Sequence, residues 1–244
     1  MTAPHFFVDP NEYPVLTAGG TVFLSTVDSH HALRSLRLHP RDALTVATGT
    51  GWLGTGRLLG ERSGRAEIEI DHVQALRPPR PRVRVAIAPP KGDRLSWAVQ
   101  KLSEVGVDGV TLIRTERTVR RPVDGSRKLL ERMAVVAREA AMQSRRPFLM
   151  TLDDQDPFTP GLWTAELKLL LWEGANRRLA EAIPPDVTSV ALAVGPEGSF
   201  TDSEVATARA AGFVDVSLGP GILRTETAAI VGAALVLARY RRLG

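Results

Sequence analysis

Short runs of apolar or alternating residues dominate the first third of the chain. They predict strands at residues 5–8, 21–25, 43–47, 53–59 and 66–70, and a helical pattern covers residues 29–36. Several short strands at close spacing are typical of a small all-β domain. We therefore expect a small β-barrel in this part of the chain.

The segment ALRPPRPRVRV, residues 75–85, separates two different patterns. Its three prolines exclude a helix and disfavour a central strand, and its alternating arginines favour exposure to water. We expect a domain boundary within this segment, with residues 1–76 forming one domain and residues 77–244 a second.

Beyond the boundary, strand patterns alternate with helical patterns. Strands are expected at residues 83–88, 109–113, 167–172, 189–195 and 214–219. Two of these runs, LKLLLW and SVALAVG, are apolar throughout, which is typical of strands buried on both faces of a parallel sheet. Apolar residues at helical spacing predict helices after Asp93, after Ser126, after Thr201 and from Thr225 onward. The alternation predicts an α/β fold.

Polar residues and one glycine mark the expected helix ends. Asp93 and Thr225 are candidate N-caps. Thr201 and Glu204 have the spacing of a capping box, and Gly212 is placed to end the helix that this box begins.

One motif matches a dinucleotide-binding loop without its context. GTGWLG, residues 49–54, has the pattern G-x-G-x-x-G after an expected strand, with Glu69 and Asp71 near the expected distance. The residues after Gly54 have a strand pattern, so no helix N-terminus would face a pyrophosphate. We expect a glycine-rich hairpin instead.

Composition favours a folded globular protein, because 43% of the residues are apolar and 24% are charged. The absence of cysteine excludes disulfides and thiolate chemistry, and the five histidines give little support for a metal site. The N-terminus lacks the pattern of a signal peptide, and the longest apolar run, residues 228–238, is shorter than the roughly 20 residues that span a membrane. We expect a cytoplasmic protein without a metal.

The chain carries a net charge of +4, and most of its 31 basic residues are arginine. Such a balance indicates an acidic partner, most often a nucleic acid. A basic surface that is only solvated is the alternative.

Glycine-rich turns follow three of the expected strands, in LLLWEGAN, AVGPEGSF and LGPGILRTETA. Ligands bind outside the carboxyl ends of the strands in open α/β sheets, so the three turns would form one pocket if the strands are neighbours. Glu173, Glu197, Arg224 and Glu226 would lie at its mouth. In the alternative, the turns are ordinary connections and Arg224 pairs with Glu197 or Glu226.

Four stretches, KGDRLSWAVQKLSEVGV, REAAMQSRR, AVGPEGSFTDSEV and LGPGILRTETA, resemble in order and spacing the 16S ribosomal RNA (uracil N3) methyltransferases of the SPOUT superfamily. HHALRSLRLHPRD resembles the N-terminal block of that family. The resemblance covers nearly the whole chain, and GPEG together with LRTETA is highly specific. It implies a PUA-like RNA-binding barrel at residues 1–76, and at residues 77–244 a SPOUT-type parallel-sheet sandwich with a deep trefoil knot. It further implies a homodimer that acts on the small ribosomal subunit.

The resemblance also implies that the knot holds S-adenosylmethionine through main-chain groups. The implied cofactor-binding residues are Leu171, Glu173, Gly195, Glu197, Gly198, Leu218, Gly219, Ile222, Leu223 and Thr225. Methyl transfer is an in-line displacement, so positioning does much of the work. Arg224 is the candidate for stabilising charge on the uracil carbonyls, and Glu197 or Glu226 is the candidate base, unless it holds Arg224 or caps the helix.

The implied contacts with RNA come from residues in the matching stretches. They are Arg34, Arg37, Lys91, Arg94, Arg117, Gln143 and Arg146. Two alternatives stay open: a SPOUT enzyme that methylates another RNA or a ribose, and an RNA-binding module without catalysis.

Three positions depart from the family pattern. Ser199 stands where the family usually has a second glycine, Gly221 where arginine is common, and Met142 where glutamate precedes Gln-Ser. None of them lies in LRTETA. The departures leave the exact target nucleotide open.

Overall fold

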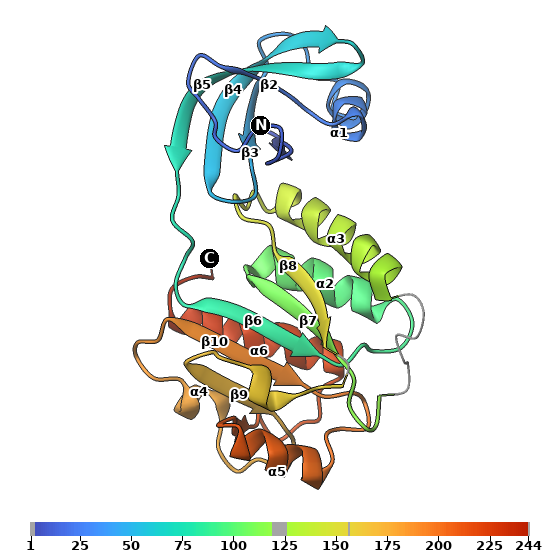
Figure 1. The fold of residues 1–244 in the computed structure, drawn as a ribbon, viewed down its shortest axis with the longest axis vertical. Coiled ribbons are helices and arrows are strands. Elements are labelled where there is room, and N and C mark those ends of the chain that lie inside the picture. The colour runs from blue at the N-terminus through green and yellow to red at the C-terminus, as the bar shows by residue number, and fades with distance from the viewer. Residues whose placement is uncertain (1–2, 119–125, 156, 244) are drawn as a thin grey trace. The chain divides into compact units, whose positions relative to one another are not determined.

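A computed structural model describes residues 3–118, 126–155 and 157–243 of the protein. The chain divides into two compact units, which Figure 1 shows as ribbons. Unit 1 consists of Met1–Pro78 and Ala141–Leu149, and unit 2 of Pro79–Ala140 and Met150–Gly244. The assignment of residues 1–76 and 77–244 as two functional domains stays a prediction.

Unit 1 is built on a five-stranded sheet with the order β1-β3-β4-β5-β2. Its elements are β1 (His5–Phe7), β2 (Thr21–Phe23), α1 (Thr26–His30), the π-helical η1 (His31–Ser35), β3 (Ala43–Ala47), β4 (Trp52–Arg62) and β5 (Arg65–Ala75). The expected strands and helical segment are confirmed, and the glycine-rich stretch at residues 49–54 leads into β4 as expected. Pairings among the described residues do not join the edge strands β1 and β2, so closure into a barrel stays a prediction.

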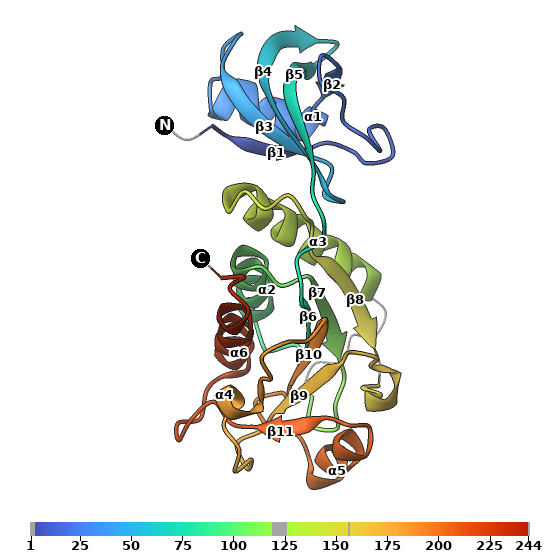
Figure 2. The ribbon, with the colours of Figure 1, turned by 90° about the vertical axis from the view of Figure 1, so that its left-hand side faces the viewer.

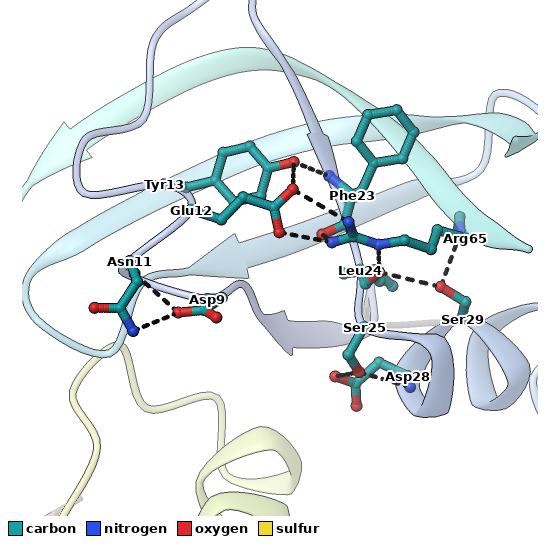
Figure 3. Close-up of polar contacts among 11 residues, drawn as sticks. Asp9, Asn11, Glu12, Tyr13, Phe23, Leu24, Ser25, Asp28, Ser29 and Arg65 are labelled. Atoms are coloured by element: carbon teal, nitrogen blue, oxygen red, sulfur yellow. Dashed lines mark hydrogen bonds and ion pairs between the residues drawn. The ribbon is translucent and has the colours of Figure 1, made fainter. Parts of the chain in front are cut away.

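A polar network fastens the loop at residues 9–13 to β2 and β5, as Figure 3 shows. The guanidinium of Arg65 donates to both carboxylate oxygens of Glu12, at 3.1 and 2.9 Å, and its Nε donates to the carbonyl of Leu24 at 2.8 Å. The Tyr13 hydroxyl accepts from the backbone N–H of Phe23 at 3.0 Å and donates to Glu12 at 2.8 Å. The loop is thereby held against the short edge strand β2.

A buried histidine connects β1 with the 141–149 segment of the same unit. The ring of His5 lies 2.8 Å from the Thr45 hydroxyl and 3.2 Å from the carbonyl of Arg146. Burial is the main reason that the pKa of His5 is lowered from 6.5 to about 4, with the nearby charge of Arg145 acting in the same direction. The folded state therefore holds a neutral imidazole at neutral and mildly acidic pH.

We expect acid to destabilise the protein through His5. In the unfolded chain the ring takes up a proton below pH 6.5, while in the folded chain it stays neutral down to about pH 4. The stability that His5 contributes is present above pH 6.5 and falls by about 3 kcal/mol as the pH drops to 4. Urea unfolding of the wild type and of His5→Gln across this range measures the difference. Equal slopes of stability against pH in the two proteins would contradict the expectation.

Unit 2 is a six-stranded parallel sheet with the order β11-β9-β10-β6-β7-β8. Its strands are β6 (Arg82–Ile87), β7 (Gly109–Ile113), β8 (Thr151–Gln155), β9 (Leu167–Leu171), β10 (Ser189–Val194) and β11 (Val214–Val216). Its helices are α2 (Arg94–Val105), α3 (Ser126–Gln143), η2 (Pro160–Leu162), α4 (Leu179–Ala182), α5 (Asp202–Ala210) and α6 (Thr225–Arg239), of which the last turn of α3 belongs to unit 1. The expected α/β fold with a parallel sheet is confirmed.

Two apolar cores lie on the two faces of this sheet. The larger core joins one face to α2, α3, α4 and α6, and the smaller joins the other face to α5 and the segment around Trp163. Figure 2 shows α2 and α6 on one side of the sheet and α5 beyond β11. Gly232 lets α6 pack closely, because a Cβ at this position would lie 2.9 Å from the Leu171 side chain. No helix in the described part of the chain is long and apolar enough to cross a membrane.

The helix ends follow the expectations in part. Thr201 and Glu204 form the expected capping box, and Gly212 follows α5 with a φ of 85°. Asp93 occupies the N-cap position of α2 as expected, but its side chain makes no capping hydrogen bond. Strand β8 was not expected, because its sequence TLDDQ is polar and it forms the edge of the sheet.

Candidate active site

A pocket opens at the carboxyl ends of three neighbouring strands. In the sheet, β9 lies between β10 and β11, so the turns that follow these strands meet at one edge. Together they line a cavity of about 570 Å³. Ligand pockets commonly have volumes of about 300–1,000 Å³, so the cavity is large enough for a nucleoside-sized molecule.

Most of the residues expected to bind a cofactor line this cavity. They are Leu171, Glu173, Gly195, Leu218, Gly219, Ile222, Leu223 and Thr225. Glu197 and Gly198 were expected there but do not line it. The carbonyl of Gly198 instead accepts a hydrogen bond of 2.9 Å from Arg117.

Two glycines in the pocket meet specific backbone requirements. Gly219 has a φ of 143°, a backbone conformation that residues other than glycine rarely adopt. A Cβ at Gly195 would lie 3.0 Å from the ring of Phe200, so a larger residue would require this ring to shift by a few tenths of an ångström. The glycines therefore permit this shape of the loops.

Two hydrogen bonds connect the pocket loops to one another. The buried hydroxyl of Thr225 donates to the carbonyl of Gly195 at 3.0 Å, and the Ser199 hydroxyl donates to Glu173 at 2.7 Å. Thr225 was expected to be an N-cap, but the N-cap position belongs to Arg224, and Thr225 fastens the start of α6 to the loop after β10. Ser199 has a φ of 62°, a conformation that suits the glycine usual at this position in the resembled family.

The three candidate catalytic residues lie next to the cavity without lining it. Arg94, at the start of α2, lies 4.0 Å from Glu197 and 3.7 Å from Glu226. Arg224 is exposed and makes no ion pair with any described residue, so it does not pair with either glutamate as the alternative had it. Glu226 is 5% exposed, and its Oε2 has no hydrogen-bond partner among the described residues.

The residues expected to contact RNA fall in both units. Lys91, Arg94 and Arg117 surround the loop of Glu197 in unit 2, where the Lys91 backbone N–H donates to Glu197 at 3.2 Å. The other four, in unit 1, are Arg34, Arg37, Gln143 and Arg146. The structure therefore brings three of the seven to the edge of the candidate active site.

Several pocket residues were missed by the sequence analysis. They are Trp172, Ala175, Asn176, Arg178, Val194, Pro196, Ser199, Val216, Ser217, Pro220, Gly221 and Ala228. Most of them are neighbours of expected residues within the same three turns. Asn176 and Arg178 could have been predicted as pocket residues, because they continue the turn after β9 beyond Glu173.

Comparison with known proteins agrees with this geometry. A family model of the RNA methyltransferase domain matches residues 77–237. The chain belongs to the RNA methyltransferase family. Ribosomal RNA small subunit methyltransferase E of Mycobacterium bovis is 32% identical to this RNA methyltransferase over 247 residues, covering 97% of the chain and 92% of the relative. The family resemblance drawn from the sequence motifs is thereby confirmed.

Solved structures of related methyltransferases share the fold along the whole chain. Ribosomal RNA small subunit methyltransferase E from Neisseria gonorrhoeae, solved with S-adenosylmethionine, is 28% identical and superposes with a TM-score of 0.85 over 97% of this chain and 98% of that one. A Legionella pneumophila protein solved with the same cofactor is 26% identical, with a TM-score of 0.84 over 98% of both chains.

Proposed function

We propose that this RNA methyltransferase uses S-adenosylmethionine to methylate N3 of a specific uridine in the 16S RNA of the small ribosomal subunit. The observation that carries the proposal is the cavity formed by three turns at one edge of the parallel sheet, in a chain of this family. Relatives named for ribosomal RNA methylation support the substrate, and neighbours solved with S-adenosylmethionine support the cofactor.

The residues of the cavity fit this cofactor. Apolar side chains of Leu171, Val194 and Leu218 suit an adenine ring, and Glu173 and Asn176 are polar groups beside them. Gly195 and Gly219 both line the cavity and carry no side chain, which leaves the main-chain N–H and C=O groups of their turns accessible to a ligand. When bound, S-adenosylmethionine would supply an electrophilic methyl group.

Side chains of the protein then have to orient the base, accept its N3 proton and stabilise the negative charge that develops on its carbonyls. We assign Arg224 to stabilise negative charge on the uracil carbonyls, because its guanidinium is held by no described partner and is next in sequence to pocket residues. Glu226 is the proposed acceptor of the N3 proton, because its Oε2 is buried and lacks a partner. Arg94 positions Glu226 and Glu197 by lying between their carboxylates.

The finer architecture is proposed on the family resemblance. Residues 1–76 are assigned as a PUA-like barrel that holds RNA through Arg34 and Arg37, and residues 77–244 as a SPOUT domain whose pocket loops form a trefoil knot. We further propose a homodimer. Trp97, Val231 and Leu235 support it, because they lie on the packed helices α2 and α6 with exposures of 46%, 37% and 45%.

The test is a parallel methylation of small ribosomal subunits, naked 16S RNA and transfer RNA with labelled S-adenosylmethionine. Digestion of the product to nucleosides, followed by mass spectrometry, identifies the modified atom. The proposal expects 3-methyluridine at one position of 16S RNA. Label found only in transfer RNA, or on a ribose, would overturn the substrate assignment while leaving methyl transfer intact.

A further inference from the structure

Three arginines surround a hollow at the end of the sheet opposite to the candidate active site. The hollow has a volume of about 330 Å³ and includes Arg80 before β6, Arg239 in the last turn of α6, and Arg241 just after that helix. None of the three makes an ion pair or side-chain hydrogen bond with a described residue, and all three are exposed. One carboxylate, that of Asp186, lines the same hollow, so positive charge predominates there.

The flanking residues fix the position of Arg241. The Tyr240 hydroxyl donates to the carbonyl of Pro184 at 2.9 Å. On the other side, the Arg242 guanidinium is 6% exposed and donates to Asp108 at 2.8 Å. The chain on both sides of Arg241 is therefore anchored, which lowers the entropy that its ordering would cost upon binding.

The backbone at Arg241 also points to a role for its side chain. The N–H of Arg242 bonds to the carbonyl of Leu237 and the N–H of Arg241 to that of Ala238, which is the Schellman pattern of a helix end. In this pattern the residue at the position of Arg241 is usually glycine, because its φ is positive. Here an arginine has a φ of 54°. Residues other than glycine in such an unfavoured backbone conformation are more common at functional positions than elsewhere.

Helix α6 connects the hollow with the candidate active site. Its first residue, Thr225, lines the cofactor cavity, and its last residue, Arg239, lines the hollow. Fifteen helical residues span about 22 Å, and Figure 2 shows α6 running from the loop after β11 to the C-terminal end of the chain. The helix dipole accounts for basic residues at Arg239 and Arg241, which lie at the C-terminal end of α6, but not for Arg80.

We propose that Arg80, Arg239 and Arg241 form a second binding site for the phosphate backbone of the substrate RNA, one helix length away from the methyl-transfer pocket. The inference rests on the proposed function, because RNA is the polyanion that it supplies. Phosphate contacts by arginine fix the position of the RNA on the protein without reading its sequence.

The test measures the affinity for 16S RNA transcribed in vitro at several salt concentrations, with two variants. For Arg80→Ala/Arg239→Ala we expect weaker binding and a slope of log K against log salt that is shallower by about 1 for each lost phosphate contact. For Arg241→Gly we expect weaker binding together with a melting temperature no lower than that of the wild type, because glycine adopts a positive φ without strain. Loss of both affinity and stability in Arg241→Gly would contradict a binding role.

Arg127→Ala/Arg132→Ala is the matched control, since it removes two exposed arginines from α3. Affinities and slopes of the hollow variants equal to those of the wild type, or changes no larger than those of this control, would overturn the proposal. Calorimetry with S-adenosylmethionine on the same proteins separates the two hypotheses: the hollow variants should bind the cofactor as the wild type does. A wild type that binds RNA but no cofactor would overturn the proposed function alone.

Discussion

The variant Arg224→Ala is expected to bind S-adenosylmethionine as the wild type does and to lose most of its turnover on RNA. Arg224 lies at the N-cap position of α6, between two pocket residues, and its guanidinium has no described partner to neutralise it. Removal of one hydrogen-bond donor that faces the developing charge of a transition state commonly costs a factor of about 10²–10³ in rate. We therefore expect kcat to fall by about that factor, measured as labelled methyl groups transferred under saturating cofactor and RNA.

Two further variants make this result specific. Arg224→Lys keeps the charge but not the planar fork of the guanidinium, so an intermediate rate is expected. Arg209→Ala removes an arginine from α5, which pairs with Asp215 at 2.7 Å outside the cavity, and should leave kcat unchanged. Full activity of Arg224→Ala would remove this residue from the mechanism, whereas loss of cofactor binding would make its role structural.

The variant Asp108→Ala is expected to cost the protein about 3–5 kcal/mol of unfolding free energy. The Asp108 side chain is 4% exposed and accepts hydrogen bonds from Arg242 at 2.8 Å and from the backbone N–H of Val83 at 2.7 Å. Its removal leaves the Arg242 guanidinium buried without its counter-charge. Arg242 keeps its hydrogen bonds to the carbonyls of Pro81 and Gly106, so the cost comes from the lost counter-charge and not from release of the chain end. Urea unfolding monitored by circular dichroism measures the loss.

An exposed ion pair serves as the reference for this prediction. Glu131 pairs with Arg127 across one turn of α3, with side chains that are 62% and 92% exposed. Glu131→Ala should therefore cost less than about 1 kcal/mol. Equal effects of Asp108→Ala and Glu131→Ala would show that the buried pair contributes no more stability than an exposed one.

Local sequence patterns were sufficient to predict most elements of the fold. Strands β9 and β10 were predictable because burial on both faces leaves only apolar residues in them, and α5 because its capping box and Gly212 define both ends. Strand β8 was not predictable, because its sequence TLDDQ is polar and its position is set by pairing with β7. Its Asp153 forms an ion pair with Arg84 of β6, a contact that no local pattern contains.

The position of the pocket was predictable from the sequence, whereas the partners of its charged residues were not. Glycine-rich turns after parallel strands must meet at the carboxyl edge if the strands are neighbours, so the position of the pocket and eight of its lining residues followed from the motifs. The partners of the charged residues did not, because they depend on how helices pack. Arg94 begins α2 and Glu226 lies in the first turn of α6, and only the packing of these two helices places their charges 3.7 Å apart.

The central claim is that the three turns after β9, β10 and β11 enclose S-adenosylmethionine, and isothermal calorimetry with this cofactor tests it most directly. Ala228 lines the cavity from α6, so the larger side chain of Ala228→Trp should fill the space that the cofactor needs. The account predicts saturable heat for the wild type and none for Ala228→Trp, at equal melting temperatures. No heat from the wild type at millimolar cofactor, or equal binding by the two proteins, would contradict it.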